Sequence, residues 1–304
     1  MSVSPGGCVF NTGQVLAELG LRVTLHARAG DDAFGDLLKS RLEREPLTAN
    51  LVRSPTAGTS YSIVLESPET DRSFWHHVGA SAEYDGTGLR VADLGAHALH
   101  VGYPSLLPAL LADAGTPLAT MLARAQAAGI LTSLDLVTVA ETSPAAGLPW
   151  RSILQRAFSR CDLASPSIDD LQTALRDTSP ATEKRIADYA EWILDAGAGL
   201  AAISAGERGS YIAVADSARL EDGHTILASL APTWAGYRAW ISAEPVKTVV
   251  TTNGAGDAHS AGMLAGLVSG FDPHHAARLA ARAAAATIQG QRSKLKDALR
   301  SRHT

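Results

Sequence analysis

The chain contains little cysteine and few aromatic residues. Only Cys8 and Cys161 occur among 304 residues, and Phe, Trp and Tyr together make up 5% of the sequence. Two cysteines exclude a disulfide-dense scaffold, and neither lies in a Cys-x-x-Cys pair of the kind that binds zinc. Because so few thiols are typical of a reducing compartment, we expect a cytoplasmic protein.

Long apolar segments and an excess of positive charge are also missing. No window of 18 residues is apolar throughout, so we expect no membrane span. The first ten residues, MSVSPGGCVF, lack the basic start and apolar stretch of a signal peptide. With 26 Lys and Arg against 31 Asp and Glu, the net charge of −5 argues against a nucleic-acid partner. An apolar fraction of 46% instead indicates a globular protein with a large core.

Short apolar runs alternate with longer helical stretches along most of the chain. Strands are predicted at 22–28, 60–67, 72–78, 98–101, 130–134, 162–164, 200–204 and 246–250. Helices are predicted at 33–45, 105–128, 150–159, 168–176, 183–196, 255–268 and 273–288. This alternation predicts an α/β fold with a mostly parallel sheet and helices on both faces. The runs 60–67 and 72–78, separated by a short turn, predict a β-hairpin.

A glycine-rich turn between a predicted strand and a predicted helix carries the clearest chemical signal. Gly254, Ala255 and Gly256 let a ligand approach the backbone, and free N–H groups at a helix N-terminus bind phosphate. Asp257 lies in the same turn. It could cap the helix, or it could accept a hydroxyl proton while the N–H groups hold a phosphoryl group. The residues alone leave both interpretations open.

Segment 251–257 resembles the Asp-Thr-x-Gly-Ala-Gly-Asp motif of the ribokinase-like (PfkB) carbohydrate kinases. Four further segments resemble motifs of that family in the same order, namely GGCVFN at 6–11, GDDAFG at 30–35, PSIDD at 166–170 and SAGERG at 204–209. The resemblance extends over nearly the whole chain and is closest to a bacterial branch of unassigned sugar kinases. It implies one ribokinase-like domain over 1–304, with three α/β/α layers and a small β-lid hairpin at about 58–80.

The resemblance implies ATP-dependent phosphoryl transfer to a hydroxyl of a sugar, a nucleoside or a related small molecule. Asp257 would be the catalytic base, and the 254–256 turn would be the anion hole. The implied substrate-binding residues are Gly6, Gly7, Asn11 and Asp32, and the implied nucleotide-binding residues are Ser167, Ser204, Gly206, Gly209 and Asn253. Asp170 would take the place of a family glutamate near Mg²⁺. The alternatives are N-cap and turn glycines for the first motif, a helix cap for Asp32 and a solvated helix surface for Asp170.

Several features depart from the family pattern. Thr251 replaces an aspartate associated with monovalent-cation binding, which leaves potassium dependence open. Family members carry a β-strand with a sugar-binding acidic residue ahead of Gly-Gly, which here stands at positions 6 and 7. We therefore expect either a misassigned start site or a protein that lacks this strand and one sugar ligand. The absence of the strand would favour an alternative function, a catalytically silent or truncated member that binds sugar or nucleotide as a sensor. The resemblance also implies a homodimer that forms through the lid hairpin.

Overall fold

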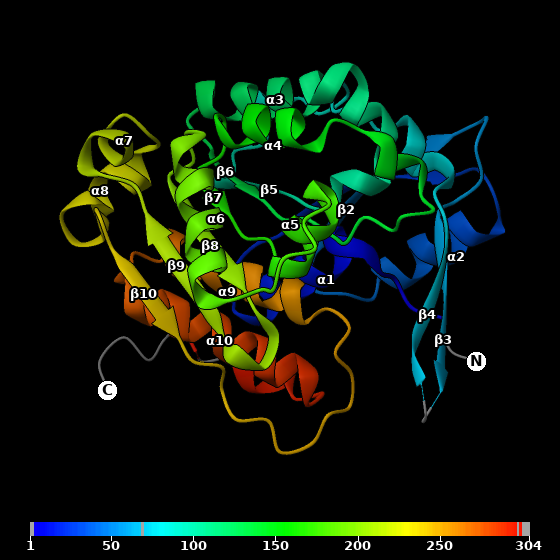
Figure 1. Cartoon of the computed structure of the whole chain (residues 1–304). Helices are drawn as coiled ribbons and strands as arrows, with labels where there is room; N and C mark the ends of the chain where they lie inside the picture. The colour runs from blue at the N-terminus through cyan, green and yellow to red at the C-terminus, as the bar shows by residue number, and fades with distance from the viewer. Residues whose placement is uncertain (1–2, 68–69, 297, 300–304) are drawn as a thin grey trace.

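The fold centres on a six-stranded sheet, shown in the computed structural model of Figure 1, which describes residues 3–67, 70–296 and 298–299. The strand order is β10-β9-β8-β7-β6-β5. The strands are β5 (Ala98–Val101), β6 (Leu131–Leu134), β7 (Leu163–Ala164), β8 (Leu200–Ser204), β9 (Ser210–Val214) and β10 (Arg238–Ile241). Strands β5 to β8 run parallel, whereas β9 and β10 pair antiparallel.

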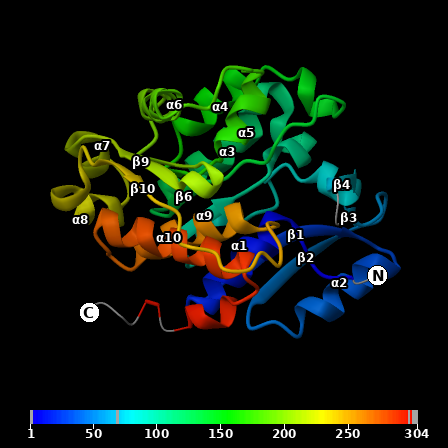
Figure 2. The ribbon, with the colours of Figure 1, turned by 60° about the horizontal axis from the view of Figure 1, so that its bottom comes forward.

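Helices cover both faces of this sheet, as Figure 2 shows. One layer holds α3 (Ala112–Ala127), α4 (Trp150–Phe158), α5 (Ile168–Leu175) and α6 (Glu183–Asp195). The opposite side holds α1 (Gly7–Glu18), α7 (Ser217–Glu221), α8 (Thr225–Trp234), α9 (Ala255–Val268) and α10 (Pro273–Ile288). Alternate side chains of each strand point to opposite faces. Thus Ala201 and Ile203 of β8 join the core under α3 to α6, and Leu200 and Ala202 join the core under α8 to α10. The predicted three-layer α/β/α fold is confirmed.

Helices α9 and α10 pack unusually close together. A Cβ added at Gly262 would lie 2.5 Å from Ala280 Cα, and one added at Gly266 would lie 2.6 Å from Ala276 Cβ. Only glycine permits this backbone approach. The close packing fixes the helix that carries Asp257.

A second, smaller sheet lies beside the main one. Strands β1 (Thr24–Gly30) and β2 (Thr48–Ser54) pair in parallel, and α2 (Ala33–Leu42) connects them. Within the described ranges, β1 pairs with β2 alone and β5 with β6 alone, so no hydrogen-bonded strand joins the two sheets. That a family strand is missing stays a prediction.

The structure has a hairpin where the sequence predicts one. Strands β3 (Tyr61–Ser67) and β4 (Thr70–His77) pair antiparallel and extend away from the two sheets (Figure 1). Residues 68–69 of the predicted turn lie outside the described residues. The role of this hairpin as a lid stays a prediction.

The predicted strand at 246–250 is wrong. This segment forms an irregular loop, in which Val249 and Val250 are 64% and 66% exposed. The N–H groups of Val250 and Thr251 donate to the carbonyl of Ile288 at the end of α10. Apolar β-branched residues favour a strand only where a neighbouring strand can pair with them, and none is beside this loop in the part of the chain that the structure describes.

Other differences concern lengths and elements that the sequence pattern does not reveal. The predicted helix at 105–128 begins as two 3₁₀ turns, Pro104–Leu106 and Pro108–Leu111, before α3. Strands β2, β9 and β10 and helices α7 and α8 are not predicted. No helix among the described residues is both long enough and apolar enough to cross a membrane.

Candidate active site

Two glycine-containing segments from opposite ends of the chain meet at the start of α9. Gly7 opens α1 with φ +74°, and Gly254 precedes α9 with φ +79°, a region that glycine adopts without strain. Val15 of α1 packs with Ala258 of α9 in one apolar cluster. As a result, Asn11 Nδ2 donates a hydrogen bond of 2.9 Å to Asp257 Oδ2. The structure thus brings the first and last predicted motifs together.

Neutral donors surround the Asp257 carboxyl group, which belongs to a residue that is only 1% exposed. Oδ2 accepts hydrogen bonds from Asn11 and from Tyr103 Oη, the latter at 2.7 Å. Oδ1 accepts one from Thr12 Oγ1 at 3.2 Å. No backbone N–H of the described residues donates to the Asp257 side chain, so the interpretation of Asp257 as a helix cap is wrong. Its carboxyl group faces side chains of α1 and of the loop after β5.

The backbone amides of the turn are mostly free. Among the described residues, the N–H groups of Gly254, Gly256 and Asp257 have no hydrogen-bond acceptor, whereas Ala255 N–H donates to Thr252 O at 3.4 Å. These groups open a helix of 14 residues, whose N-terminus carries a partial positive charge. No described atom lies within 4 Å of a Cβ added at Gly256. The turn therefore offers donors and space to an anion.

Several predicted nucleotide residues lie together at the ends of β7 and β8. Ser167 and Ser204 form a parallel bridge, and Ser204 N–H donates to Pro166 O. Gly206 has φ +59° and open space at its Cβ position. Gly209 has φ +97°, and a Cβ there would lie 2.0 Å from Ile241 O, so this glycine is needed by the fold itself. Asn253 lies in the exposed turn ahead of α9, where its N–H donates to Thr251 Oγ1.

Asp170 is buried rather than solvated, which corrects one alternative from the sequence. It is 7% exposed and forms a capping box with Ser167, whose N–H donates to Asp170 Oδ2 at 2.8 Å. Burial raises the pKa of Asp170 to about 6, against the hydrogen bonds from Ser167. The charges of Asp169 and Asp257 raise this pKa further. Asp170 and Asp257 are thus electrostatically coupled.

Asp32 acts as a helix cap. Its Oδ1 accepts from Gly35 N–H and from Thr59 Oγ1, and its Oδ2 accepts from Thr59 N–H. Hydrogen bonds from Thr59 and Gly35 lower the pKa of Asp32 to about 2. Capping is one of the two interpretations that the sequence left open. Contact of Asp32 with a substrate stays a prediction. The same holds for Gly6 and Gly7, where an added Cβ would meet no described atom within 4 Å, so that the space beside them is open.

Sequence reasoning missed several residues that contact or adjoin Asp257. Thr12 and Tyr103 donate to it directly, and Tyr103 adopts φ +59°, a rare conformation for an aromatic residue. Asp135, which directly follows β6, is 3% exposed. Burial and the charges of Asp257 and Asp170 raise the pKa of Asp135. One signal was available, because polar residues that follow parallel strands meet at the same edge of a sheet.

Comparison with known proteins decides the family. The pfkB family carbohydrate kinase profile matches residues 1–296. The chain belongs to the pfkB family of carbohydrate kinases. No curated protein matches the chain significantly in sequence.

Solved structures of pfkB proteins and related kinases share the fold at low sequence identity. A PfkB protein from Polaromonas sp. JS666 is 22% identical, with a TM-score of 0.71, over 95% of this chain and 88% of the other. Ribokinase from Thermotoga maritima is 18% identical, with a TM-score of 0.72, over 99% and 88% of the two chains. A Burkholderia thailandensis nucleoside kinase, solved in complex with inosine, is 17% identical, with a TM-score of 0.68, over 98% of this chain and 86% of the other.

Proposed function

We propose that this pfkB-family protein transfers the γ-phosphoryl group of ATP to a hydroxyl of a sugar or a nucleoside. Asp257 is the proposed base, and the turn over residues 254–256 is the proposed anion site. The observation that carries the proposal is the position of the Asp257 carboxyl group, within three residues of backbone amides that have no acceptor among the described residues. Family membership supports sugar or nucleoside kinase activity in general.

The hydrogen bonds of Asp257 favour one oxygen as the proton acceptor. A carboxylate offers two acceptor positions on each oxygen. Asn11 and Tyr103 occupy both positions on Oδ2, whereas Thr12 occupies only one on Oδ1. We therefore assign Oδ1 as the atom that accepts the proton of the attacking hydroxyl. The three donors hold the carboxyl group in one orientation, which is what positioning of a nucleophile requires.

The amides of Gly254 and Gly256 are the proposed donors to the transferred phosphoryl group. The transition state of phosphoryl transfer is loose and carries its charge on the equatorial oxygens. Preorganised N–H donors at a helix N-terminus stabilise such charge without reorganisation. Ala255 N–H contributes less in this proposal, because it already donates to Thr252 O.

The residues at the ends of β7 and β8 suit ATP and Mg²⁺. Ser167, Ser204 and the open space at Gly206 form the proposed nucleotide side of the site. Asp170 Oδ2 accepts from Ser167, and its Oδ1 accepts no hydrogen bond from the described residues. An anionic oxygen of this kind is a ligand that Mg²⁺ prefers, directly or through water. Mg²⁺ supplies charge neutralisation of the phosphates when it is bound.

The β3–β4 hairpin is the proposed lid and dimer contact. Tyr61, Ile63 and Leu65 alternate along β3 and share one face, and Trp75 pairs with Ile63 across the hairpin. All four are exposed, Trp75 to 64%. An exposed apolar face of this kind is typical of a surface that covers a ligand or a second subunit.

A coupled assay of ADP release tests the proposal. Ribose, fructose, other ketoses, sugar acids and nucleosides serve as acceptors, and Asp257→Asn is compared with Asp169→Asn, an exposed aspartate in the first turn of another helix. Because a general base contributes about 10²–10⁴-fold, we expect Asp257→Asn to lower kcat at least about 100-fold. Asp169→Asn should retain activity. Near-normal turnover by Asp257→Asn would refute the base.

The same panel tests the sensor alternative. A sugar or nucleotide that raises Tm without any ADP release from the wild-type protein would indicate binding without catalysis. Such a result would contradict the proposed kinase activity and leave the fold assignment untouched.

A further inference from the structure

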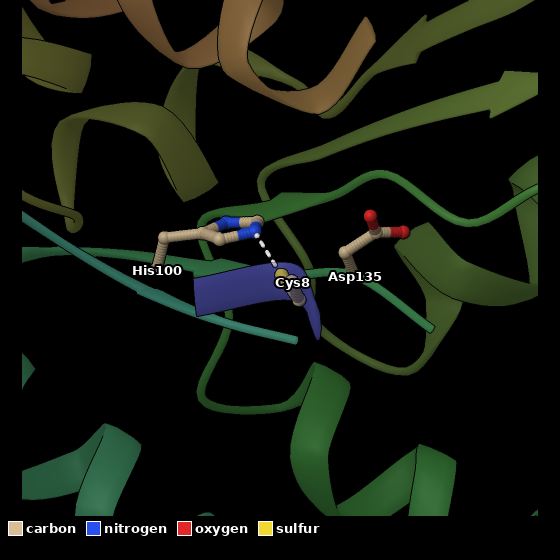
Figure 3. A group of neighbouring side chains, drawn as sticks. All are labelled: Cys8, His100 and Asp135. Carbon is tan, nitrogen blue, oxygen red and sulfur yellow. Dashed lines mark hydrogen bonds between the residues drawn. The ribbon is translucent and has the colours of Figure 1, made fainter. Parts of the chain in front are cut away.

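Cys8, His100 and Asp135 form a cluster of three different donor types beside the proposed active site (Figure 3). Cys8 lies in the first turn of α1, His100 on β5, and Asp135 directly after β6. Cys8 Sγ lies 3.3 Å from His100 Nε2. One donor atom from each of the three side chains lies within 4.8 Å of the other two. In Figure 3 the Cys8 side chain lies between the other two.

Neighbouring groups hold these donors in place. His100 Nδ1 lies 2.8 Å from Ser133 Oγ, which leaves Nε2 directed toward Cys8. Metal-binding histidines are commonly oriented by such a bond at the second ring nitrogen. A Cβ at Gly102 would lie 1.9 Å from Cys8 Sγ, so a glycine at this position is what permits the thiol to reach the cluster.

Acidic groups close to the cluster act on it electrostatically. Burial, followed by the charges of Asp257 and Asp135, raises the pKa of Cys8. Burial and the charges of Asp257 and Asp170 raise the pKa of Asp135. The neutral imidazole of His100 offers Nε2 as a ligand atom on the side of Cys8. The negative charge of Asp257 and Asp170 nearby would favour a bound metal cation.

We propose that Cys8, His100 and Asp135 bind a divalent transition-metal ion, Zn²⁺ in preference to Mg²⁺. Bonds of about 2.3 Å to sulfur and 2.0–2.1 Å to nitrogen place tetrahedral ligands about 3.6 Å apart. The observed Sγ to Nε2 distance of 3.3 Å requires a shift of only a few tenths of an ångström. A thiolate and an imidazole select zinc-like ions over Mg²⁺, which prefers oxygen ligands. The fourth position is left to water.

Cobalt spectroscopy on the full-length, metal-free protein tests this site. Co²⁺ added to the wild-type protein should produce a thiolate-to-metal charge-transfer band that saturates at one equivalent. The band should disappear in Cys8→Ser and persist in Cys161→Ser, which removes the other buried cysteine. Zn²⁺ should remove the band by displacing Co²⁺, whereas excess Mg²⁺ should leave it unchanged.

Chelator competition then measures the affinity for Zn²⁺. We expect Cys8→Ser and Asp135→Asn each to weaken binding at least 100-fold, and Ser133→Ala to weaken it about 10-fold through the orientation of His100. Circular dichroism identifies any variant that fails to fold, and Ser133→Ala keeps the site testable if the ligand variants unfold. No charge-transfer band in the wild-type protein, or an equal band in Cys8→Ser, overturns the proposal. The spectrum does not depend on turnover, so it remains informative if the proposed kinase activity fails.

Discussion

The buried carboxyl group of Asp170 should make the stability of the protein depend on pH. Its pKa lies at about 6 in the folded protein, compared with 3.8 for an ordinary aspartate. The folded chain therefore binds this proton more tightly than the unfolded chain does. The resulting stabilisation is complete below pH 4 and is lost as the pH rises through about 6. A difference of about two pH units corresponds to about 3 kcal/mol, and little of it is screened by solvent because the group is buried.

Asp170→Asn removes the titration and keeps a side-chain oxygen for the capping bond with Ser167. We expect the free energy of unfolding of Asp170→Asn, relative to wild type, to rise by about 2.4 kcal/mol between pH 4 and pH 7. Urea unfolding followed by tryptophan fluorescence at pH 4, 5, 6 and 7 measures this difference. A difference for Asp170→Asn that stays constant, or that falls toward pH 7, would refute the reasoning.

Three further substitutions test the surroundings of the site. Tyr103→Phe removes a hydrogen-bond donor to the Asp257 carboxyl group. It should lower the free energy of unfolding by about 1.5–3 kcal/mol, measured by urea unfolding at pH 7. An unchanged urea midpoint would contradict this hydrogen bond. His259 is buried, and neither of its ring nitrogens is hydrogen-bonded among the described residues. Burial lowers the pKa of His259 to about 4, so the unfolded chain binds this proton more tightly than the folded one. The wild-type protein should therefore lose stability as the pH falls below 6.5. In His259→Phe, the free energy of unfolding should fall by about 2 kcal/mol less between pH 7 and pH 5 than it does in wild type. An equal fall in both proteins would exclude His259 as the source of this pH dependence. Gly209→Ala should lower Tm much more than Gly206→Ala, because an added Cβ meets Ile241 O at 2.0 Å only at the former; equal shifts in thermal melts would argue against the tight turn.

The sequence correctly predicted those helices and strands whose ends are marked by residues next to them in the chain. The helices at 255–268 and 273–288 match α9 and α10, and the strand at 98–101 matches β5. The signal for α9 is the glycine turn ahead of it, and the signal for α10 is its Asp-Pro start. The signal for β5 is a short apolar run bounded by polar residues. The same local reasoning failed at 246–250, where two valines suggested a strand but no neighbouring described strand pairs with them. Strand formation depends on a partner that lies elsewhere in the chain.

The sequence by itself determined the family, the order of α and β elements and the glycine turn ahead of Asp257, because these follow from motifs that span a few residues. Only the tertiary structure brought Asn11 within 2.9 Å of Asp257, across a separation of 246 residues. It likewise placed Tyr103 on the same carboxyl group, and Cys8 beside His100. These contacts depend on the packing of α1 against α9 and on parallel strands that end at one edge of the sheet. No local pattern encodes such distances, because they arise only when separate segments share one core.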